Sequence, residues 1–474
     1  MSGSISATRI ATLVGDFDRS PAYAGLAAAL RLLIGDGRIL LDTRLPSERE
    51  LTEALGVSRT TITRAYAELR DSGYAEAQQG SGTFTRVPGG RRRALDNALL
   101  PYSGDEDAID LNCAAASAPP GVASAYAAAV EELPAHLGGH GYFPAGIPVL
   151  QAAIAATYAA RGLPTRPEQI MVTPGALTAA AIVAQALTGP GDRLLVESPV
   201  YPNATQALRQ NGARLVPSAV DPDGWDLDAI AATLQQTRPT LAYLIPDFQN
   251  PTGHLMSDDQ RAAYAEQLRT TRTVAVVDEA HQSLPLEGQP MPRPFAAYAP
   301  STISIGSASK SFWGGLRLGW IRSSDEQMVR LTRARIGFDL GAPVFEQLVL
   351  TRLLDDPEPI LAEQRQRLRA QRDRLAAAVT EHLPEWRFRL PSGGLALWCE
   401  LPQAGATAVV AEAERRGVIL APGPVFAAEG GLDRFVRIPW TLPGDQLEEA
   451  VVRLAGAWAA VDRGDQPRPR IMVA

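Results

Sequence analysis

Lysine is almost missing from this sequence. The 474 residues include 45 basic side chains, and the one lysine among them is Lys310, within SASKSFWGGLRLGW at residues 307–320. A compositional bias of the whole genome would give the same scarcity. Arginine stays protonated at any working pH, whereas a partly buried lysine can lose its proton and attack a carbonyl group. Lys310 is therefore a candidate nucleophile.

Cysteine and long apolar runs are also scarce. Two cysteines, Cys113 and Cys399, are too few for a disulfide framework or a cysteine metal cluster. The first 20 residues lack a basic segment leading into an apolar one, and no apolar run approaches the ~20 residues that cross a bilayer. The sequence thus predicts a cytoplasmic protein with no metal site and no membrane partner.

An excess of positive charge is absent as well. The formal net charge is -7, and residues 1–90 contain 10 arginines against 10 acidic residues. This balance argues against broad nonspecific attraction to nucleic acid, although a local binding face remains open.

The chain is longer than one hydrophobic core usually supports, so two or more domains are expected. Residues 88–108, PGGRRRALDNALLPYSGDEDA, carry a basic run and then an acidic run without core periodicity, which is typical of a linker. We predict a domain over residues 1–88, a linker over 89–109 and a second domain over 110–474. The linker arginines could contact a DNA backbone or belong to a solvated hinge.

Residues 21–87 predict short helices followed by a hairpin. A helix starts at Pro21, and two more occupy LPSERELTEALGVSRTTITRAYAELRDSGY at residues 45–74. Ser47 and Ser58 are their N-caps, and Gly56 supplies the tight turn between them. The second helix is expected to run to Gly73. The predicted shared core consists of Leu51, Ala54, Leu55, Val57, Ile62, Ala65, Tyr66 and Leu69.

Hydroxyl, guanidinium and free backbone N–H groups gather at the start of the helix after Ser58, where they could meet a phosphate or a base edge. With the following GSGTF, the segment resembles the GntR-type winged helix-turn-helix. This resemblance implies double-stranded DNA as a partner and assigns its contacts to Arg49, Ser58, Arg59, Thr60, Thr61, Arg64, Gly80 and Ser81. A purely structural or protein-binding helical module is the alternative.

From residue 110 onward, apolar runs alternate with helical segments. The runs at 193–198, 241–246, 273–278 and 302–307 are almost continuously apolar, which is typical of strands buried on both faces of a parallel sheet. Polar residues follow these strands, where open α/β sheets bind ligands. The predicted fold class is α/β with a mainly parallel sheet.

The surroundings of Lys310 predict an anion pocket beside the amine. Ser307, Ser309 and Arg317 flank it, and a carbonyl compound that bears a phosphate, such as pyridoxal phosphate, would suit both features. Together with NPTG at 250–253 and VVDEAH at 276–281, the stretch resembles fold-type I aminotransferases over residues 110 to about 460. The order of the two halves is similar to MocR/GabR-type bacterial regulators.

The resemblance implies pyridoxal 5'-phosphate as cofactor and a role for each matching residue. Lys310 would bond covalently to the aldehyde, Asp278 would hold the pyridine nitrogen protonated, and Arg437 would bind the carboxylate of an amino acid. The remaining implied cofactor contacts are Asn250 to the phenolic oxygen, Tyr201 on the ring face, and Gly175, Ala176, Leu177, Ser307, Ser309, Arg317 and Tyr142 around the phosphate, the last from the partner of a homodimer.

Two positions depart from the family pattern. His281 stands where a tyrosine often bonds the phenolic oxygen, and we expect its imidazole to donate there instead. Gln151 stands where arginine is common.

Three functions remain open on this evidence. The first is a transcriptional regulator whose amino-acid or amine effector reacts at the cofactor. The second is a working aminotransferase tethered to a winged helix, and the third is a regulator that senses pyridoxal phosphate itself. An effector can shift a two-state regulator only if it binds the two states unequally.

Overall fold

The structure of the protein is a computed structural model that describes residues 4–35, 38–39, 41–78, 81–86, 99 and 108–462. The helices are α1 Ala7–Val14, α2 Ala22–Gly35, α3 Glu48–Leu55, α4 Arg59–Asp71, α5 Val122–Glu132, α6 Pro148–Ala160, α7 Ala176–Leu187, α8 Pro202–Arg209, α9 Leu227–Thr237, α10 Asp258–Thr271, α11 Ala308–Ser311, α12 Asp325–Arg335, α13 Val344–Asp355, α14 Glu358–His382, α15 Ala406–Arg415 and α16 Gly444–Asp462. Short 3-10 helices are η1 Leu133–His136, η2 Pro167–Gln169, η3 Phe295–Ala297, η4 Gly314–Leu316 and η5 Gly423–Phe426.

The strands are β1 Ala75–Gln78, β2 Gly82–Thr85, β3 Ile109–Asp110, β4 Ile170–Thr173, β5 Arg193–Ser198, β6 Arg214–Asp221, β7 Gly224–Trp225, β8 Leu241–Leu244, β9 Val274–Asp278, β10 Ile303–Ser307, β11 Gly319–Arg322, β12 Ala396–Glu400, β13 Val418–Ile419, β14 Ala421–Pro422 and β15 Phe435–Pro439.

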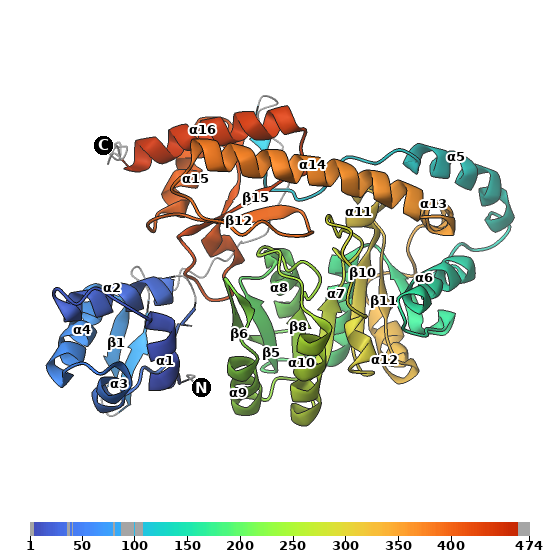
Figure 1. Ribbon diagram of the computed structural model, residues 1–474. Helices are drawn as coiled ribbons and strands as arrows, with labels where there is room; N and C mark the ends of the chain where they lie inside the picture. Colours follow the sequence, from blue (N-terminus) through green and yellow to red (C-terminus); the bar gives the residue numbers. More distant parts are fainter. Residues whose placement is uncertain are drawn as a thin grey trace, which may run out of the picture.

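The N-terminal unit consists of α1 to α4 and the antiparallel hairpin β1–β2, drawn in blue in Figure 1. Ser47 caps α3 through a complete capping box with Glu50, Gly56 ends that helix at φ 64°, and Ser58 caps α4. Each cap gives a hydrogen-bond acceptor to backbone N–H groups that the helix leaves without a partner. The two predicted helix starts and the turn between them are therefore confirmed.

The predicted core of this unit is nearly as expected. Leu51, Ile62, Ala65, Tyr66 and Leu69 are buried, and Leu55 and Val57 pack against them. Ala54 is exposed, contrary to the prediction, because α3 buries the side of Leu51 and turns Ala54 to solvent. The second helix ends at Asp71 rather than reaching Gly73. Sequence analysis did not anticipate α1, which packs on α2 and α3.

An eight-stranded sheet forms the centre of the C-terminal unit, in the order β4-β11-β10-β9-β8-β5-β6-β7. The pairs from β10 through β9, β8 and β5 to β6 are parallel, whereas β11 runs antiparallel to both of its neighbours and β7 antiparallel to β6. The prediction of an α/β fold with a mainly parallel sheet is confirmed.

Helices cover both faces of this sheet. Leu194 and Val196 of β5 belong to a core with α7, α8 and α12, while Leu195 between them belongs to a core with α9 and α10. Successive side chains of a strand point to opposite faces. Both faces need apolar residues here, which explains the nearly continuous apolar runs in the sequence.

Residues 358–462 form a smaller layer above the sheet in Figure 1. The antiparallel strands β12-β15-β14 and the parallel pair β13-β3 pack with α14, α15 and α16 around Trp440 and Cys399, both fully buried. The pairing of β3 with β13 brings residues 109–110 beside 418–419, far away in the chain. This second sheet was not predicted from the sequence.

The linker prediction falls mostly outside the described residues, as does Gly80. Both cysteines are free thiols. None of the helices in the described ranges combines the length and the apolar character needed to span a bilayer.

Candidate functional sites

The start of α4 and the outer surface of α3 form the candidate DNA-binding face. The side chains of Arg49 and Arg59 are 87% and 76% exposed. Each guanidinium has an acidic neighbour, Glu53 at 3.4 Å and Glu48 at 3.2 Å respectively. Exposed ion pairs of this kind contribute only about 0–1 kcal/mol, so a phosphate group could displace either carboxylate.

The other predicted DNA contacts surround this face. The Ser58 hydroxyl accepts the N–H of Thr61 at 3.1 Å, and Thr60 is exposed beside it. The guanidinium of Arg64 lies over the ring of Tyr23, 4.4 Å from its centroid, a contact that sequence analysis missed. Ser81 is exposed at the hairpin tip. The face therefore offers hydroxyls and guanidinium groups around an uncovered helix N-terminus.

Lys310 lies in the one-turn helix α11, directly after β10. Its Nζ donates a hydrogen bond of 2.9 Å to the carbonyl oxygen of Ala114. Burial lowers the pKa of Lys310, the positive charges of Arg437 and Arg317 lower it further, and the negative charge of Asp278 acts in the opposite direction. The surroundings thus ease the loss of the proton, which leaves the amine in its nucleophilic form.

Asp278 ends β9, next to β10 in the sheet. Its carboxylate accepts the Tyr243 hydroxyl at 2.6 Å and the backbone N–H of Ala280 at 2.9 Å. Burial raises the pKa of Asp278, and these two hydrogen bonds and Lys310 partly offset that rise. Tyr243 was not predicted from the sequence, although it is the one polar side chain within the apolar run LAYLIP.

The turn before α7 and the segment after Lys310 form one cradle. Gly175 has φ +100°, and a Cβ built there would lie 3.2 Å from Nη2 of Arg317. A side chain at 175 would therefore press on the guanidinium as well as strain the backbone. Ala176 and Leu177 start α7, and the Ser307 hydroxyl accepts the N–H of Ser309 at 3.2 Å. Gly319, which pairs with Ser307, also lies against Gly175 and Ala176, so the turn, Arg317 and the end of β10 are neighbours.

Tyr201 and Asn250 lie on loops that follow β5 and β8. Tyr201 precedes α8, and burial raises its pKa to about 12. The side chain of Asn250 makes no hydrogen bond with a described residue. Tyr142 is 59% exposed and stacks on His140, at 5.8 Å between ring centroids. Its hydroxyl has no hydrogen-bond partner among the described residues.

Arg437 is 1% exposed and lies in β15, opposite Trp398 of β12. One terminal nitrogen donates to the carbonyl oxygen of Asn112, and the guanidinium lies over the Phe426 ring, 4.8 Å from its centroid. Its Nε is buried without an acceptor in the described structure. Burial lowers the pKa of Arg437 to about 10. A buried guanidinium with an unused donor is suited to a carboxylate ligand.

The hydrogen bond of His281 disfavours the donation to the phenolic oxygen that was expected from the sequence. Its Nδ1 lies 3.1 Å from the carbonyl oxygen of Phe248, and since a carbonyl only accepts, Nδ1 carries the proton. Burial lowers the pKa of His281 to about 4, so the ring is neutral at pH 7 and Nε2 presents a lone pair. Gln151 joins α6 to β4 by donating to the carbonyl of Ile170 at 2.7 Å.

Two supporting features escaped sequence analysis. Residues 112–114 contact both basic side chains of the site, because the carbonyls of Asn112 and Ala114 accept from Arg437 and Lys310. Glu197 of β5 accepts from Gln249 at 3.1 Å, next to the NPTG turn, and burial raises the pKa of Glu197 to about 7. No local sequence signal marks the first feature. A glutamate inside the apolar run RLLVES could have indicated the second.

Three features around Lys310 fit pyridoxal phosphate, whatever the family resemblance implies. The side-chain-free turn at Gly175 faces a guanidinium, the amine of Lys310 has a lowered pKa, and the Nε of Arg437 lacks an acceptor. A phosphate, an aldehyde and an α-carboxylate would satisfy these three positions in turn.

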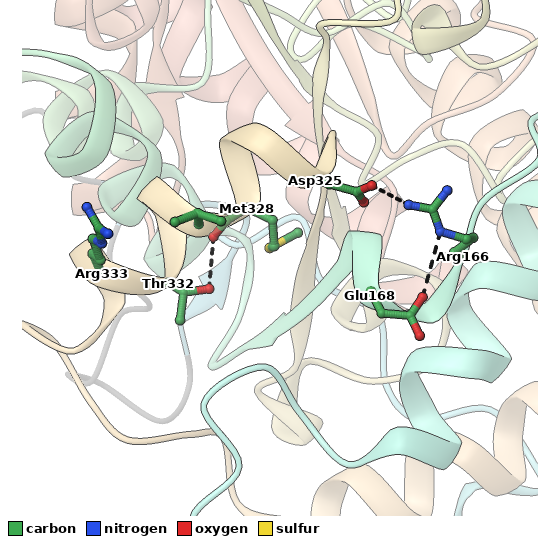
Figure 2. Close-up of a pocket in the computed structure, with 7 residues that line it drawn as sticks. Arg166, Glu168, Asp325, Met328, Thr332 and Arg333 are labelled. Atoms are coloured by element: carbon green, nitrogen blue, oxygen red, sulfur yellow. Dashed lines mark hydrogen bonds and ion pairs between the residues drawn. The ribbon is translucent and has the colours of Figure 1, made fainter.

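A different hollow, of about 650 Å³, opens between η2 and α12, as shown in Figure 2. Arg166 lies there between Asp325, with which it forms an ion pair, and Glu168 at 3.9 Å. Within α12, the Thr332 hydroxyl donates to the Met328 carbonyl. None of the predicted site residues lines this hollow.

Fold and sites define a class of protein in which a helix-turn-helix DNA-binding unit is joined to an aminotransferase fold. Residues 114–454 match the family described as aminotransferase class I and II, and residues 22–85 match bacterial regulatory proteins of the gntR family. The chain belongs to the aminotransferase class I and II family, and the predicted resemblance to MocR-type regulators is confirmed.

Individual relatives agree with this assignment. The chain is 28% identical to YdcR, an uncharacterized HTH-type transcriptional regulator of Escherichia coli, over 92% of this chain and 98% of that protein. It is 30% identical to the probable rhizopine catabolism regulatory protein MocR of Rhizobium meliloti, over 64% of this chain and 65% of that protein. Among solved structures, LysN, an α-aminoadipate aminotransferase of Thermus thermophilus complexed with N-(5'-phosphopyridoxyl)-L-leucine, has a TM-score of 0.70 at 29% identity, over 76% of this chain and 94% of that chain.

Proposed function

We propose that this protein is a pyridoxal phosphate-dependent transcriptional regulator that binds double-stranded DNA through its N-terminal unit and a small amino compound through its aminotransferase fold. The observation that carries the proposal is the occurrence of both sites in one chain. The capped helices α3 and α4 expose guanidinium groups. Lys310 lies close enough to Arg437 and Asp278 for their charges to change its pKa.

Pyridoxal phosphate supplies an aldehyde that captures amines and a ring that withdraws electrons. We assign to Lys310 the covalent attachment of the aldehyde and to Asp278 the ion pair with the pyridine nitrogen. Tyr243 would fix the Asp278 carboxylate by its 2.6 Å hydrogen bond, and Tyr201 would cover the ring. Asn250 would donate to the phenolic oxygen, and His281 would face the same region with a lone pair rather than a proton.

The anionic groups of the ligands would meet separate sets of donors. The phosphate would be held by the N–H groups of Gly175, Ala176 and Leu177 and by Ser307, Ser309 and Arg317. Arg437 would bind the effector carboxylate with the donor that has no acceptor in the described structure. Burial strengthens such a charge-assisted hydrogen bond, because water competes less.

On the DNA side, we assign the phosphate and base contacts to Arg49, Ser58, Arg59, Thr60, Thr61, Arg64, Gly80 and Ser81. Arg64 would be held in place by its stacking on Tyr23. We further propose a cytoplasmic homodimer with domains at residues 1–88 and 110–474, in which Tyr142 reaches the phosphate of its partner. The 59% exposure of Tyr142 supports a contact outside its own subunit.

A working aminotransferase is the second candidate, and the fully built Lys310–Asp278–Arg437 constellation favours it. A regulator must remain in its ligand-bound state for the signal to last. An enzyme leaves that state each time it releases product. We expect amino acids to bind the cofactor-loaded protein and change DNA occupancy while keto-acid production stays slow. Both quantities should be followed over one panel of amino acids and amines. Rapid multiple turnover without any change in DNA occupancy would favour the tethered enzyme.

A further inference from the structure

The N-terminal unit is attached to the aminotransferase fold by contacts outside the linker. Gly35 is the last residue of α2, and the N–H of Leu432 donates to its carbonyl oxygen at 2.5 Å. Arg9 of α1 forms an ion pair with Asp226 at the start of α9. The last carbonyls of a helix have no partner within the helix. The aminotransferase fold therefore caps a helix of the DNA-binding unit.

The loop that provides this cap has an uncommon conformation. Gly430, Gly431 and Leu432 have φ values of 98°, 90° and 64°, all in the left-handed region. A Cβ on Gly431 would lie 3.2 Å from the Gly35 carbonyl oxygen, so the loop needs glycine where it meets α2. Leucine adopts this conformation only at a cost, which its surroundings must offset. Leu432 is 2% exposed and packs with Phe435 and Ala427.

The same loop leads directly to the carboxylate-binding arginine. The Leu432 carbonyl accepts the N–H of Phe435, which starts the strand that carries Arg437. Trp398 stacks on Phe435 at 5.1 Å and meets Phe426 edge-on at 5.5 Å, and Phe426 lies under the Arg437 guanidinium. A displacement of that guanidinium would therefore press on an aromatic cluster that packs against Leu432 and Ala427 of the loop.

A second connection runs from the cofactor side. The N–H of Val200, next to Tyr201, donates to the Phe426 carbonyl at 3.0 Å. At the other end of α8, Arg209 donates to the carbonyl of Ala428 at 3.0 Å. Both ends of the helix that follows Tyr201 thus hold the segment from Phe426 to Leu432.

We propose that residues 427–432, which we term the docking loop, form with Asp226 the surface on which the N-terminal unit docks, and that a carboxylate at Arg437 changes this docking. The second half of the proposal rests on the proposed function of Arg437. The docked elements are α1 and the end of α2. The side chains of Arg49 and Arg59 on α3 and α4 stay largely exposed, so docking fixes the orientation of the DNA-binding face without covering it.

Removal of the ion pair tests the docking surface. Asp226→Asn keeps an N-cap for α9, because an asparagine side chain can still accept from the N–H groups of residues 228 and 229, but it removes the charge that Arg9 meets. Arg9→Gln removes the other partner. Asp228→Asn is the matched control, since it makes the same charge change in the same turn and its side chain forms no ion pair among the described residues.

Hydrogen exchange at the Leu432 amide reports docking directly, because its acceptor belongs to the other unit. We expect exchange to become roughly tenfold faster or more in Arg9→Gln and in Asp226→Asn, with no change in Asp228→Asn. Adding Asp226→Asn to Arg9→Gln should change little further, since the ion pair is already broken in Arg9→Gln. Unchanged exchange in both single variants would overturn the docking surface.

The coupling is tested with two stable compounds, N-(5'-phosphopyridoxyl)-L-leucine and its counterpart without the carboxylate, N-(5'-phosphopyridoxyl)-isoamylamine. Binding of each to the apoprotein is measured by calorimetry. We expect the first compound to change Leu432 exchange several-fold relative to the second. If both compounds bind and the exchange rates agree, the coupling is wrong and the proposed function stands. If neither compound binds, the proposed cofactor site is wrong and with it the coupling, while the exchange of the Arg9 and Asp226 variants still decides the docking surface.

Discussion

At the scale of single residues, the scarcity of lysine makes the cofactor attachment testable without ambiguity. An endoprotease specific for lysine should cut the denatured chain once, after Lys310, because no other lysine is present. Borohydride reduction of the cofactor-loaded protein should block this cut, since the reduced nitrogen is no longer a free amine. Lys310→Ala should fold but lose the visible absorbance of the bound cofactor. Cleavage of the reduced protein at the normal rate would show that the aldehyde does not bond to Lys310.

His281 gives a prediction about stability and pH. Burial lowers its pKa to about 4, below the ordinary value of 6.5, so between these values the unfolded chain holds a proton that the folded chain lacks. Stability from this residue is therefore complete above the ordinary pKa and is lost as pH falls. Between pH 7.5 and 5 we expect a loss of about 2 kcal/mol in the free energy of unfolding.

The comparison variant is His281→Asn, measured by urea unfolding at both pH values. Burial raises the pKa of Glu197 to about 7, which changes stability in the opposite direction, so only the difference between variant and wild type isolates the imidazole. Equal pH dependence of the two proteins would mean that His281 titrates normally.

At the scale of elements, Ser58 separates the stability of α4 from its proposed contact with phosphate. Ser58→Ala removes the cap and should lower the free energy of unfolding of the N-terminal unit by ~1 kcal/mol. Ser58→Asp keeps a good cap but adds a negative charge where DNA phosphates should lie. We expect Ser58→Asp to retain stability and lose DNA affinity. DNA binding like that of wild type would place the phosphates elsewhere.

The helices around Ser58 and the strands β5, β8, β9 and β10 of the large sheet were predictable because their signals are local. Capping residues act within four positions of the sequence, and a run that is apolar on both faces reveals a buried strand. The strands β12 to β15 were not recognised, since they are short and pair with partners distant in sequence, such as β13 with β3.

At the scale of the whole molecule, the proposed homodimer predicts sites shared between subunits. Tyr142→Phe removes only the hydroxyl and should weaken cofactor binding about tenfold or more, as expected for a hydrogen bond to a charged group. Mixed dimers of Tyr142→Phe and Lys310→Ala should contain one intact site, because Tyr142 of the Lys310→Ala subunit completes its partner's pocket. We would follow cofactor absorbance after mixing. A monomeric protein with full cofactor affinity would exclude this arrangement.

By itself, the sequence determined which residues could do chemistry. Three local patterns were recognisable from a few neighbouring residues each. They are the lone Lys310, Asp278 at the end of a strand and Gly175 in the turn before a helix. The tertiary structure alone decided the state of those groups. Contacts between segments far apart in the chain lower the pKa of Lys310 and leave a lone pair on His281. Such contacts also bury Arg437 against Asn112 and join Gly35 to Leu432. Burial and long-range hydrogen bonds set charge and tautomer, and neither depends on the spacing of neighbouring residues.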